Sequence, residues 1–137
     1  MSSRNLTFKV GGIHFDEHKE LSEGMAIEVM PDPKIVYIPM SQHIGAPCKP
    51  VVSVGDSVKV GQTVGSSEAF ISADVHSSVS GTVKEIKKMY TADGRYCDCV
   101  AIESDGKGEI YEGIKPVENY KDLSLDDLIP IVKKAGI

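Results

Sequence analysis

The sequence lacks tryptophan, any block of basic residues and any apolar run of membrane-spanning length. Because the formal net charge is −5 and phosphate binding requires a basic surface, nucleic acid is not expected as a partner. A transmembrane helix needs about 20 consecutive apolar residues, so no direct membrane span is expected either. The N-terminus lacks the apolar centre of a secretory signal peptide, which favours a cytoplasmic chain.

Cysteine is scarce as well, and the three cysteines form no familiar ligand pattern. Cys48, Cys97 and Cys99 include no C-x-x-C motif, and no iron–sulfur spacing is present. We expect all three thiols to be reduced and structural, as is usual in a reducing compartment. The alternative is a zinc site built from the three thiols and His43, although zinc ligands usually come in closely spaced pairs.

Catalytic constellations are also absent. The 4 histidines and the many serines match a Ser–His–Asp pattern only by chance. The paired carboxylates of Asp126 and Asp127 lie at the start of an expected helix, where they interact favourably with the helix dipole rather than serve acid–base chemistry. We therefore predict no catalytic, cofactor-binding or metal-binding residue in this chain, which alone is not expected to be catalytic.

Glycine and proline are abundant by contrast, with 13 and 7 residues, and they separate short runs of Val, Ile and Thr. Residues 51–83 consist of such runs, interrupted by turns such as Gly55-Asp56. Glycine adopts positive φ without steric cost, and an aspartate carboxylate accepts a nearby backbone N–H bond. The turn and strand at 54–59 are echoed at 79–84, which predicts a small β domain with two similar halves facing each other.

Alternating patterns predict further strands. Residues 34–38 form a strand with apolar residues on both sides, so we expect it to be covered on both faces. The dipeptide Asp93-Gly94 predicts a hairpin between strands at 82–89 and 96–103.

A helix is predicted for residues 124–137, where apolar residues recur at helical spacing. Ser124 and Asp127 resemble a capping box. Pro130 lies inside this segment, so we expect a lost backbone bond or a kink. The predicted organisation is an irregular lead over 1–30, a β domain over 31–108, and a connector with a helix over 109–137.

The spacing V-x-x-G-D-x-V-x-x-G-Q, followed by S-G-T-V, resembles the biotinyl and lipoyl carrier domains. This resemblance implies a mostly β barrel-sandwich hybrid, a flattened barrel of two small sheets. Carrier domains bear a modified lysine on a hairpin tip, which here corresponds to residues 69–76, with arms at 69–71 and 74–76. No lysine occurs from Gly61 to Val83, so no biotin or lipoyl group is expected. A free-standing carrier-like binding domain without a modifiable lysine is one alternative.

A longer ordered set of motifs carries a more specific resemblance. In chain order the motifs are FKVGGIH, IPMSQHIGAP, VGDSVKVGQ and VHSSVSGTV. Together they resemble the N-terminal region of the C subunit of the Rnf electron-transport complex. The candidate structural and interaction residues in these motifs are Gly11, Gly12, His14, Gln42, His43, Gly45, Gly55, Asp56, Gly61, Gln62, His76, Ser80 and Gly81.

The resemblance implies a structural and docking domain of a peripheral subunit on the cytoplasmic side of the cell membrane. The family's complex transfers electrons between NADH and ferredoxin, coupled to sodium or proton translocation. Other subunits and the remainder of the same subunit are the partners that this implies. Flavin mononucleotide, NADH and two 4Fe-4S clusters are expected in the rest of the subunit, which would continue into a nucleotide-binding domain, and no cofactor is expected in this chain. The alternative is the equivalent module of a sodium-translocating NADH:quinone reductase subunit.

Overall fold

The computed structural model describes residues 18–137, and the chain divides into two units, Met1–Pro31 and Asp32–Ile137. In the described part of the first unit, a turn follows His18, whose ring lies 3.6 Å from the carboxylate of Glu20. The rest of this described part forms no helix or strand. Among the described residues, all regular structure therefore belongs to the second unit.

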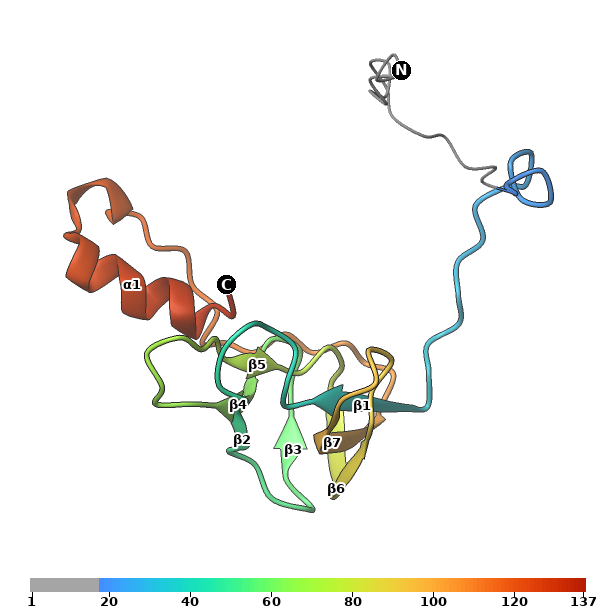
Figure 1. Ribbon diagram of the computed structural model, residues 1–137, viewed down its shortest axis with the longest axis horizontal. Helices are drawn as coiled ribbons and strands as arrows, with labels where there is room; N and C mark the ends of the chain where they lie inside the picture. The colour runs from blue at the N-terminus through green and yellow to red at the C-terminus, as the bar shows by residue number, and fades with distance from the viewer. Residues whose placement is uncertain (1–17) are drawn as a thin grey trace, which may run out of the picture. The chain divides into compact units, whose positions relative to one another are not determined.

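Two antiparallel β sheets and a C-terminal helix make up the second unit (Figure 1). The larger sheet has the order β1-β7-β6-β3, with bounds Ile35–Pro39, Tyr96–Ser104, Gly81–Tyr90 and Ser57–Val58. The smaller sheet has the order β2-β4-β5, with bounds Lys49–Pro50, Thr63–Ser66 and Val75–His76. A short 3-10 helix, η1 (Tyr120–Asp122), precedes α1 (Leu125–Lys134). The predicted fold class, mostly β with a C-terminal helix, is confirmed.

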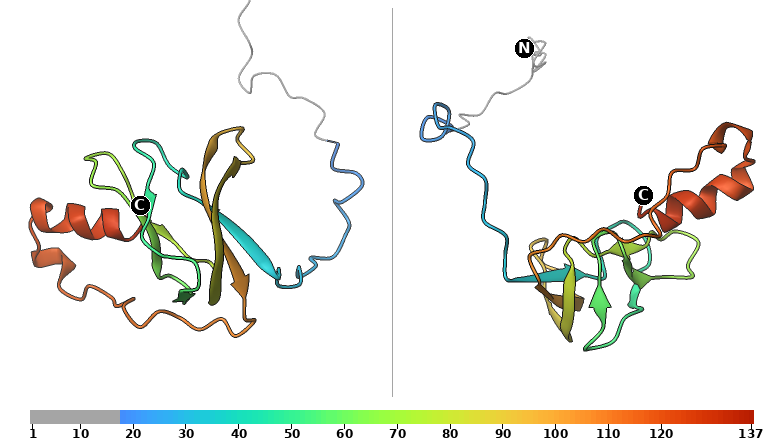
Figure 2. Two further views of the ribbon diagram at one scale, coloured as in Figure 1. Left: turned by 90° about the horizontal axis from the view of Figure 1, so that it is seen from below. Right: turned by 180° about the vertical axis from the view of Figure 1, so that it is seen from behind.

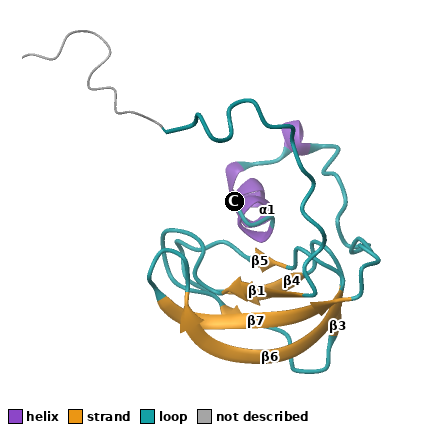
Figure 3. Ribbon diagram, turned by 90° about the vertical axis from the view of Figure 1, so that its right-hand side faces the viewer, coloured by secondary structure: helices purple, strands orange, loops and turns teal. Residues whose placement is uncertain are grey.

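The long strands β6 and β7 form the predicted hairpin and curve together (Figure 3). In its turn, the N–H of Thr91 donates to the carbonyl of Arg95 at 2.8 Å, and Gly94 has a φ of 80°. The rings of Tyr90 and Tyr96, where the two strands meet this turn, lie 4.9 Å apart. The turn thus needs its glycine, because a φ of this sign disfavours other residues.

The core consists of apolar side chains that point from the strands into one interior. Val100 and Ile102, two positions apart on β7, are fully buried, as are Val64 and Val83. Alternate residues of a strand point to opposite faces, so this spacing aims both β7 side chains inward. Burial of each such side chain contributes about 1.5–3 kcal/mol, which fixes the register of the pairing. The complete cluster comprises Ile38, Met40, Cys48, Val58, Val64, Val75, Val83, Val100 and Ile102.

The two copies of the sequence echo lie side by side in the larger sheet, rather than facing each other from two halves as predicted. β3 pairs with β6 in antiparallel register, with Ser57 opposite Thr82. Beyond this pairing, the N–H of Gly55 donates to the carbonyl of Val83 at 2.8 Å. The N–H of Val83 in turn donates to the carbonyl of Asp56 at 2.9 Å. The glycine turn of the first copy is therefore bonded directly to the strand of the second.

β1 differs from its prediction, because only one of its faces is covered. Val36 and Ile38 point toward the core, whereas Ile35 and Tyr37 are 43% and 42% exposed on the other face. β1 is an edge strand that pairs only with β7, and no second layer of the described chain covers its outer side. On this outer face, the ammonium group of Lys87 lies over the Tyr37 ring, 5.0 Å from its centroid.

The segment after β7 returns to the barrel before it reaches the helix. Val60 forms a parallel bridge with Ile110. The N–H of Val60 donates to the carbonyl of Glu109 at 2.8 Å, and the N–H of Tyr111 donates to the carbonyl of Val60 at 2.9 Å. The first residues of the expected connector are thus hydrogen-bonded to the β domain.

α1 begins at the predicted capping box. The side chain of Ser124 accepts the N–H of Asp127, whose carboxylate accepts the N–H of Ser124. The helix continues through Pro130, where a backbone N–H is missing, and ends at Lys134. None of its ten residues, all within the described chain, is buried. Figure 2 shows its C-terminal end nearest the sheets and its N-terminal end extending away from them.

Neither helical segment of the described chain has the length and apolar character that a bilayer crossing requires.

Candidate functional site

The loop that connects β4 and β5, residues 67–74, contains most of the predicted hairpin. The predicted hairpin arm at 69–71 is wrong, because this segment forms no strand. Instead, the hydroxyl of Ser72 donates to the carbonyl of Ala69 at 2.7 Å, which closes a turn within the loop. The loop contains no lysine, so its chemistry differs from that of a carrier tip.

His43 links the 67–74 loop to the loop at 40–48. Its Nε2 accepts the backbone N–H of Ala73 at 3.2 Å, and its Nδ1 lies 3.0 Å from the carbonyl of Ile44. A ring nitrogen that accepts a hydrogen bond carries no proton, so these bonds assign the neutral tautomer protonated on Nδ1. The imidazole therefore holds two loops in contact.

Gly45 allows the same two loops to approach closely. The N–H of Ala46 donates to the carbonyl of Ile71 at 3.0 Å. Gly45 has a φ of 119°, and a Cβ at this position would collide with the carbonyl oxygen of Ile71. Both the dihedral angle and the contact require glycine.

Cys48 lies beneath this contact and bonds to the same residue as His43. Its buried thiol donates to the carbonyl of Ala73 at 3.0 Å and lies 3.8 Å from His43 Nε2. Burial raises the pKa of the Cys48 thiol; the Asp74 carboxylate raises it further, while Lys133 acts in the opposite direction. A thiol whose pKa is raised is a poor nucleophile. Because the thiol of Cys48 is also buried and bonded to Ala73, we assign it a structural role.

The C-terminal end of α1 is bonded to the 67–74 loop. The N–H of Asp74 donates to the carbonyl of Lys133 at 3.0 Å, and the Lys133 ammonium donates to the carbonyl of Ala69 at 3.0 Å. A Cβ added to Gly136 would lie 2.9 Å from the carbonyl oxygen of Asp74. The 40–48 loop, the 67–74 loop and α1 therefore meet at one place, which we call the loop junction.

An apolar groove of about 580 Å³ opens beside the loop junction. Its lining comes from all three segments, with polar contributions from His43, Ser72 and Lys133. Phe70 and Leu125 are 94% and 75% exposed although both are apolar. The most exposed apolar residues of this groove are Ile44, Phe70, Ile71, Leu125, Ile129 and Ile137. The arrangement is suited to contact with another apolar surface rather than to proton or group transfer.

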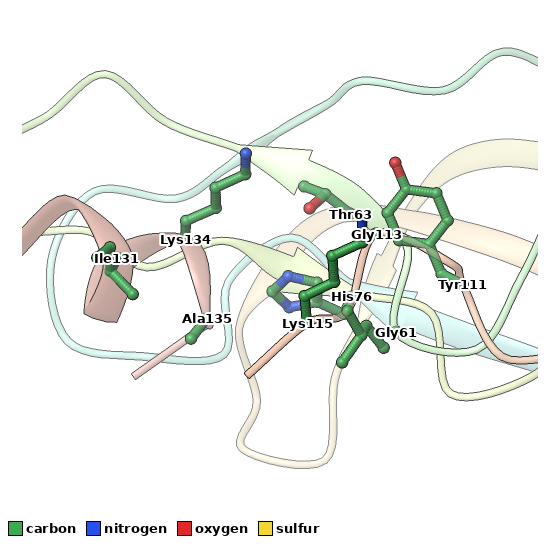
Figure 4. Close-up of a pocket in the computed structure, with 10 residues that line it drawn as sticks. Gly61, Thr63, His76, Tyr111, Gly113, Lys115, Ile131, Lys134 and Ala135 are labelled. Atoms are coloured by element: carbon green, nitrogen blue, oxygen red, sulfur yellow. The ribbon is translucent and has the colours of Figure 1, made fainter. Parts of the chain in front are cut away.

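A second pocket, of about 420 Å³, lies between β4, β5, the connector and α1 (Figure 4). It brings together two residues of the sequence motifs, Gly61 and His76. The N–H of Gly61 donates to the carbonyl of Ser77 at 2.8 Å, so this glycine is bonded to the segment that follows β5. Lys115 and Lys134 contribute to the lining, and no carboxylate of the described chain does.

Several other motif residues stabilise turns through hydrogen bonds within a few residues of sequence. The carboxylate of Asp56 accepts the N–H of Ser53 at 2.8 Å, next to Gly55, which has a φ of 96°. The side-chain oxygen of Gln62 accepts the N–H of Lys59 at 3.0 Å. The side-chain amide of Gln42, by contrast, is a donor, and it bonds to the carbonyl of Pro39 at 3.0 Å.

Ser80 and Gly81 connect β6 to the segment that follows β7. The buried hydroxyl of Ser80 donates to Asp105 at 2.6 Å and accepts the N–H of Glu109 at 3.1 Å. The hydrogen bond from Ser80, followed by that from the N–H of Lys107, lowers the pKa of the Asp105 carboxyl. A Cβ on Gly81 would collide with the carbonyl oxygen of Glu103. The remaining candidates, Gly11, Gly12 and His14, lie outside the described residues.

The zinc alternative finds no support in the described chain. Across residues 18–137, no group of three or more His, Cys, Asp or Glu side chains is placed to hold a metal ion. All three cysteines are free thiols. Burial, followed by the neighbouring Cys97, raises the pKa of Cys99 to about 11. The surroundings of Cys99 therefore hold it as a neutral thiol in the folded chain.

The contribution of α1 to the loop junction was not predicted from the sequence. Motifs identified the 40–48 loop, but neither Lys133 nor Phe70 and Ile71 in the 67–74 loop was assigned an interaction role. The available signal was the apolar Phe70-Ile71 pair in a segment otherwise rich in serine. That pair was interpreted as a strand arm because aromatic and β-branched residues favour strands.

Comparison with known proteins identifies a family and several relatives. A family model described as "RnfC Barrel sandwich hybrid domain" matches residues 6–107. This description agrees with the barrel-sandwich hybrid that the resemblance to carrier domains implies, and that prediction is confirmed.

Curated relatives match nearly the whole chain. It is 43% identical over 127 residues to the C subunit of the proton-translocating ferredoxin:NAD(+) oxidoreductase complex of Clostridium ljungdahlii, a match that covers 93% of this chain and 28% of that protein. It is 42% identical over 137 residues to the C subunit of the Na(+)-translocating ferredoxin:NAD(+) oxidoreductase complex of Acetobacterium woodii, over 100% of this chain and 31% of that protein. It is 37% identical over 131 residues to the C subunit of the ion-translocating oxidoreductase complex of Serratia proteamaculans, over 93% of this chain and 18% of that protein. The chain thus spans less than a third of the length of these relatives.

Proposed function

The chain belongs to the RnfC barrel sandwich hybrid family, and from this premise we propose that it is the structural and docking domain of the C subunit in an ion-translocating ferredoxin:NAD oxidoreductase complex. The match of residues 6–107 to the family carries the proposal. Relatives named as the C subunits of such complexes match 93% and 100% of the chain, which supports the assignment to this subunit.

The chemistry of the described residues supports docking rather than catalysis. The 67–74 loop has no lysine that could carry a biotin or lipoyl group. The ring of His43 and the thiol of Cys48 are both bonded to the backbone of Ala73. These side chains hold loops in place and are not directed at a substrate.

The redox cofactors that the family implies would be bound by the rest of the protein. A 4Fe-4S cluster is held by four cysteine thiolates, whereas the chain has 3 cysteines, and no group of three or more His, Cys, Asp or Glu side chains among the described residues is placed to hold a metal ion. The N-terminus of α1, where a flavin phosphate could otherwise bind, is occupied by the capping box of Ser124 and Asp127. The described residues therefore do not fit these groups, and this domain contributes no electron-transfer step.

On this proposal the chain lies at the cytoplasmic face of the membrane, as part of a peripheral subunit. Its partners would be the remainder of the C subunit and the neighbouring subunits of the complex. Sequence alone assigns neither sodium nor proton as the coupling ion, because the Clostridium and Acetobacterium relatives carry names with different ions.

Co-purification tests the proposed function. The matching segment of the Acetobacterium woodii C subunit would be replaced by this chain, and the resulting chimera would be tagged and isolated from membranes. We expect the remaining subunits of the oxidoreductase complex to co-purify in the same ratio as with the tagged native protein. A chimera that is folded but isolated without them would contradict the proposal. Assembly instead with subunits of a sodium-translocating NADH:quinone reductase, offered in the same experiment, would favour that alternative.

A further inference from the structure

We propose that the apolar groove beside the loop junction is the surface on which this domain docks the remaining part of the C subunit, through an apolar helical face of that part. This inference rests on the proposed function and specifies the docking surface and its occupant. The groove is distinct from the polar turns that most of the sequence motifs form.

The groove is a continuous apolar surface made by three segments. Phe70, Leu125 and Ile129 are 94%, 75% and 57% exposed. All of them line the same groove. Isolated exposed apolar side chains are ordinary, but a contiguous set of this kind marks an interaction surface.

The groove is also preformed, because hydrogen bonds within the chain join the three segments that line it. Two hydrogen bonds fix α1 against the 67–74 loop. The N–H of Asp74 donates to the carbonyl of Lys133, and the ammonium of Lys133 donates to the carbonyl of Ala69. The bond from Ala73 to His43 fixes that loop against the 40–48 loop. A preformed surface binds more tightly because less conformational freedom is lost on association.

α1 presents an apolar face that the described chain leaves largely exposed. Isolated helices shorter than about 12–15 residues are marginal in water, and most helices are stabilised by packing of an apolar face. α1 has ten residues, none of them buried in the described chain. Leu125, Ile129 and Val132 lie on one helical stripe, which faces the groove. A second apolar helix laid along this stripe would bury it, as in helix-in-groove recognition.

The remainder of the C subunit is the occupant that the chain lengths favour. More than two thirds of the Clostridium and Acetobacterium relatives lies outside the segment that they share with this chain. A polypeptide joined covalently to the domain by a short linker meets its surface at an effective concentration on the order of mM. A second copy or a separate subunit would have to compete with this linked partner.

Site-specific photo-crosslinking in the assembled chimera tests the groove. A benzophenone amino acid would be placed at Phe70 or Ile129, and at Val54 or Tyr96 as controls. The control positions are 62% and 60% exposed and lie outside the groove. We expect positions 70 and 129 to crosslink to peptides of the C subunit outside the matched segment, with a yield about tenfold or more above the controls. Crosslinks from the groove to another subunit or to a second copy, or equal yields at all four positions, would overturn the inference.

Serine variants give a second measurement that does not depend on crosslinking geometry. Phe70→Ser and Ile129→Ser should accelerate hydrogen exchange of the α1 amides in the complex by about tenfold or more, because the docked face is weakened. Val54→Ser should leave this exchange unchanged. Unchanged exchange in both groove variants would also overturn the inference.

The outcome separates the two proposals. A chimera that assembles but crosslinks from the groove to a different partner leaves the proposed function intact and removes this inference. A chimera that folds and fails to assemble contradicts the proposed function, and the inference falls with it.

Discussion

His43 Nε2 accepts the backbone N–H of Ala73 at 3.2 Å, across 30 residues of sequence. The carbonyl of Ala73 accepts a hydrogen bond from the thiol of Cys48. The N–H and the carbonyl of this one residue are thus both bonded to side chains of the 40–48 loop. Ala73 is 6% exposed, and water cannot readily replace either partner. The two loops are therefore joined by bonds that would be costly to lose.

Removal of the His43 ring should destabilise the domain. His43→Ala leaves the buried N–H of Ala73 without an acceptor, and we expect the free energy of unfolding to fall by about 1–3 kcal/mol. Urea denaturation at neutral pH measures this loss. Gln42→Ala, which removes an exposed hydrogen bond to Pro39, is the matched control and should change stability by about 0.5 kcal/mol or less. Equal losses in both variants would contradict the role assigned to His43.

Two glycines with positive φ should respond differently to alanine. Gly55 has open space around its Cα, so Gly55→Ala should cost only the strain of a positive φ, about 1–2 kcal/mol. Gly45→Ala adds a collision with the carbonyl oxygen of Ile71, and we expect a total cost of about 2–5 kcal/mol. Thermal unfolding of the two variants in parallel shows which substitution costs more stability. A Gly45 variant as stable as the Gly55 variant would show that the two loops separate easily.

Asp105 should make stability depend on pH at the acidic end. The hydrogen bond from Ser80 and then that from Lys107 lower the pKa of this carboxyl in the folded state. Its contribution is therefore fully present above the unfolded pKa of about 3.9 and is lost as pH falls through the folded pKa. Asp105→Asn should be less stable than the native chain at pH 7, and this difference should shrink as the pH falls below about 4.

The control for this pH effect is Ser80→Ala, which removes the hydroxyl donor. In that background the pH dependence of the Asp105→Asn difference should be weaker. The measurement is the free energy of unfolding in urea across the acidic range. If the native chain and Asp105→Asn differ in free energy of unfolding by the same amount at neutral and acidic pH, the lowered pKa assigned to Asp105 is disproved.

The three thiols should differ in reactivity. Burial and the neighbouring Cys97 raise the pKa of Cys99 to about 11, and burial raises the pKa of Cys48. Because the thiolate is the reactive form, Cys97, which is only partly buried, should react first with iodoacetamide at about pH 8. Mass spectrometry of the native chain should show one modified cysteine, and three after denaturation in urea. Rapid modification of Cys48 or Cys99 in the native chain would contradict the burial described for them.

Much of the barrel could be predicted from the sequence because its signals are local. The turn at Gly94 and the capping box at Ser124 each depend on residues within one short segment, and both are confirmed. The alternation of Val100 and Ile102 likewise indicated that they share one face, which is buried. In these cases the physical cause lies within a few residues of the effect.

The errors concern contacts between distant segments. The strand predicted at 34–38 was expected to be covered on both faces, but the position of β1 at a sheet edge depends on the whole topology. Residues 69–71 have strand-forming composition, yet the bond from Ser72 to Ala69 folds them into a turn. The bond from Lys133 to Ala69 spans 64 residues, and no local pattern indicates it. The groove was missed for this reason.

Deletion of this domain from the C subunit tests the central claim, docking within an oxidoreductase complex, most directly. The measurement is the amount of the C subunit that remains with washed membranes, relative to a membrane-embedded subunit of the same complex. We expect deletion to release the C subunit from the membrane and reinsertion of this chain to restore the native ratio. Retention of the C subunit at the native ratio after deletion would contradict the account.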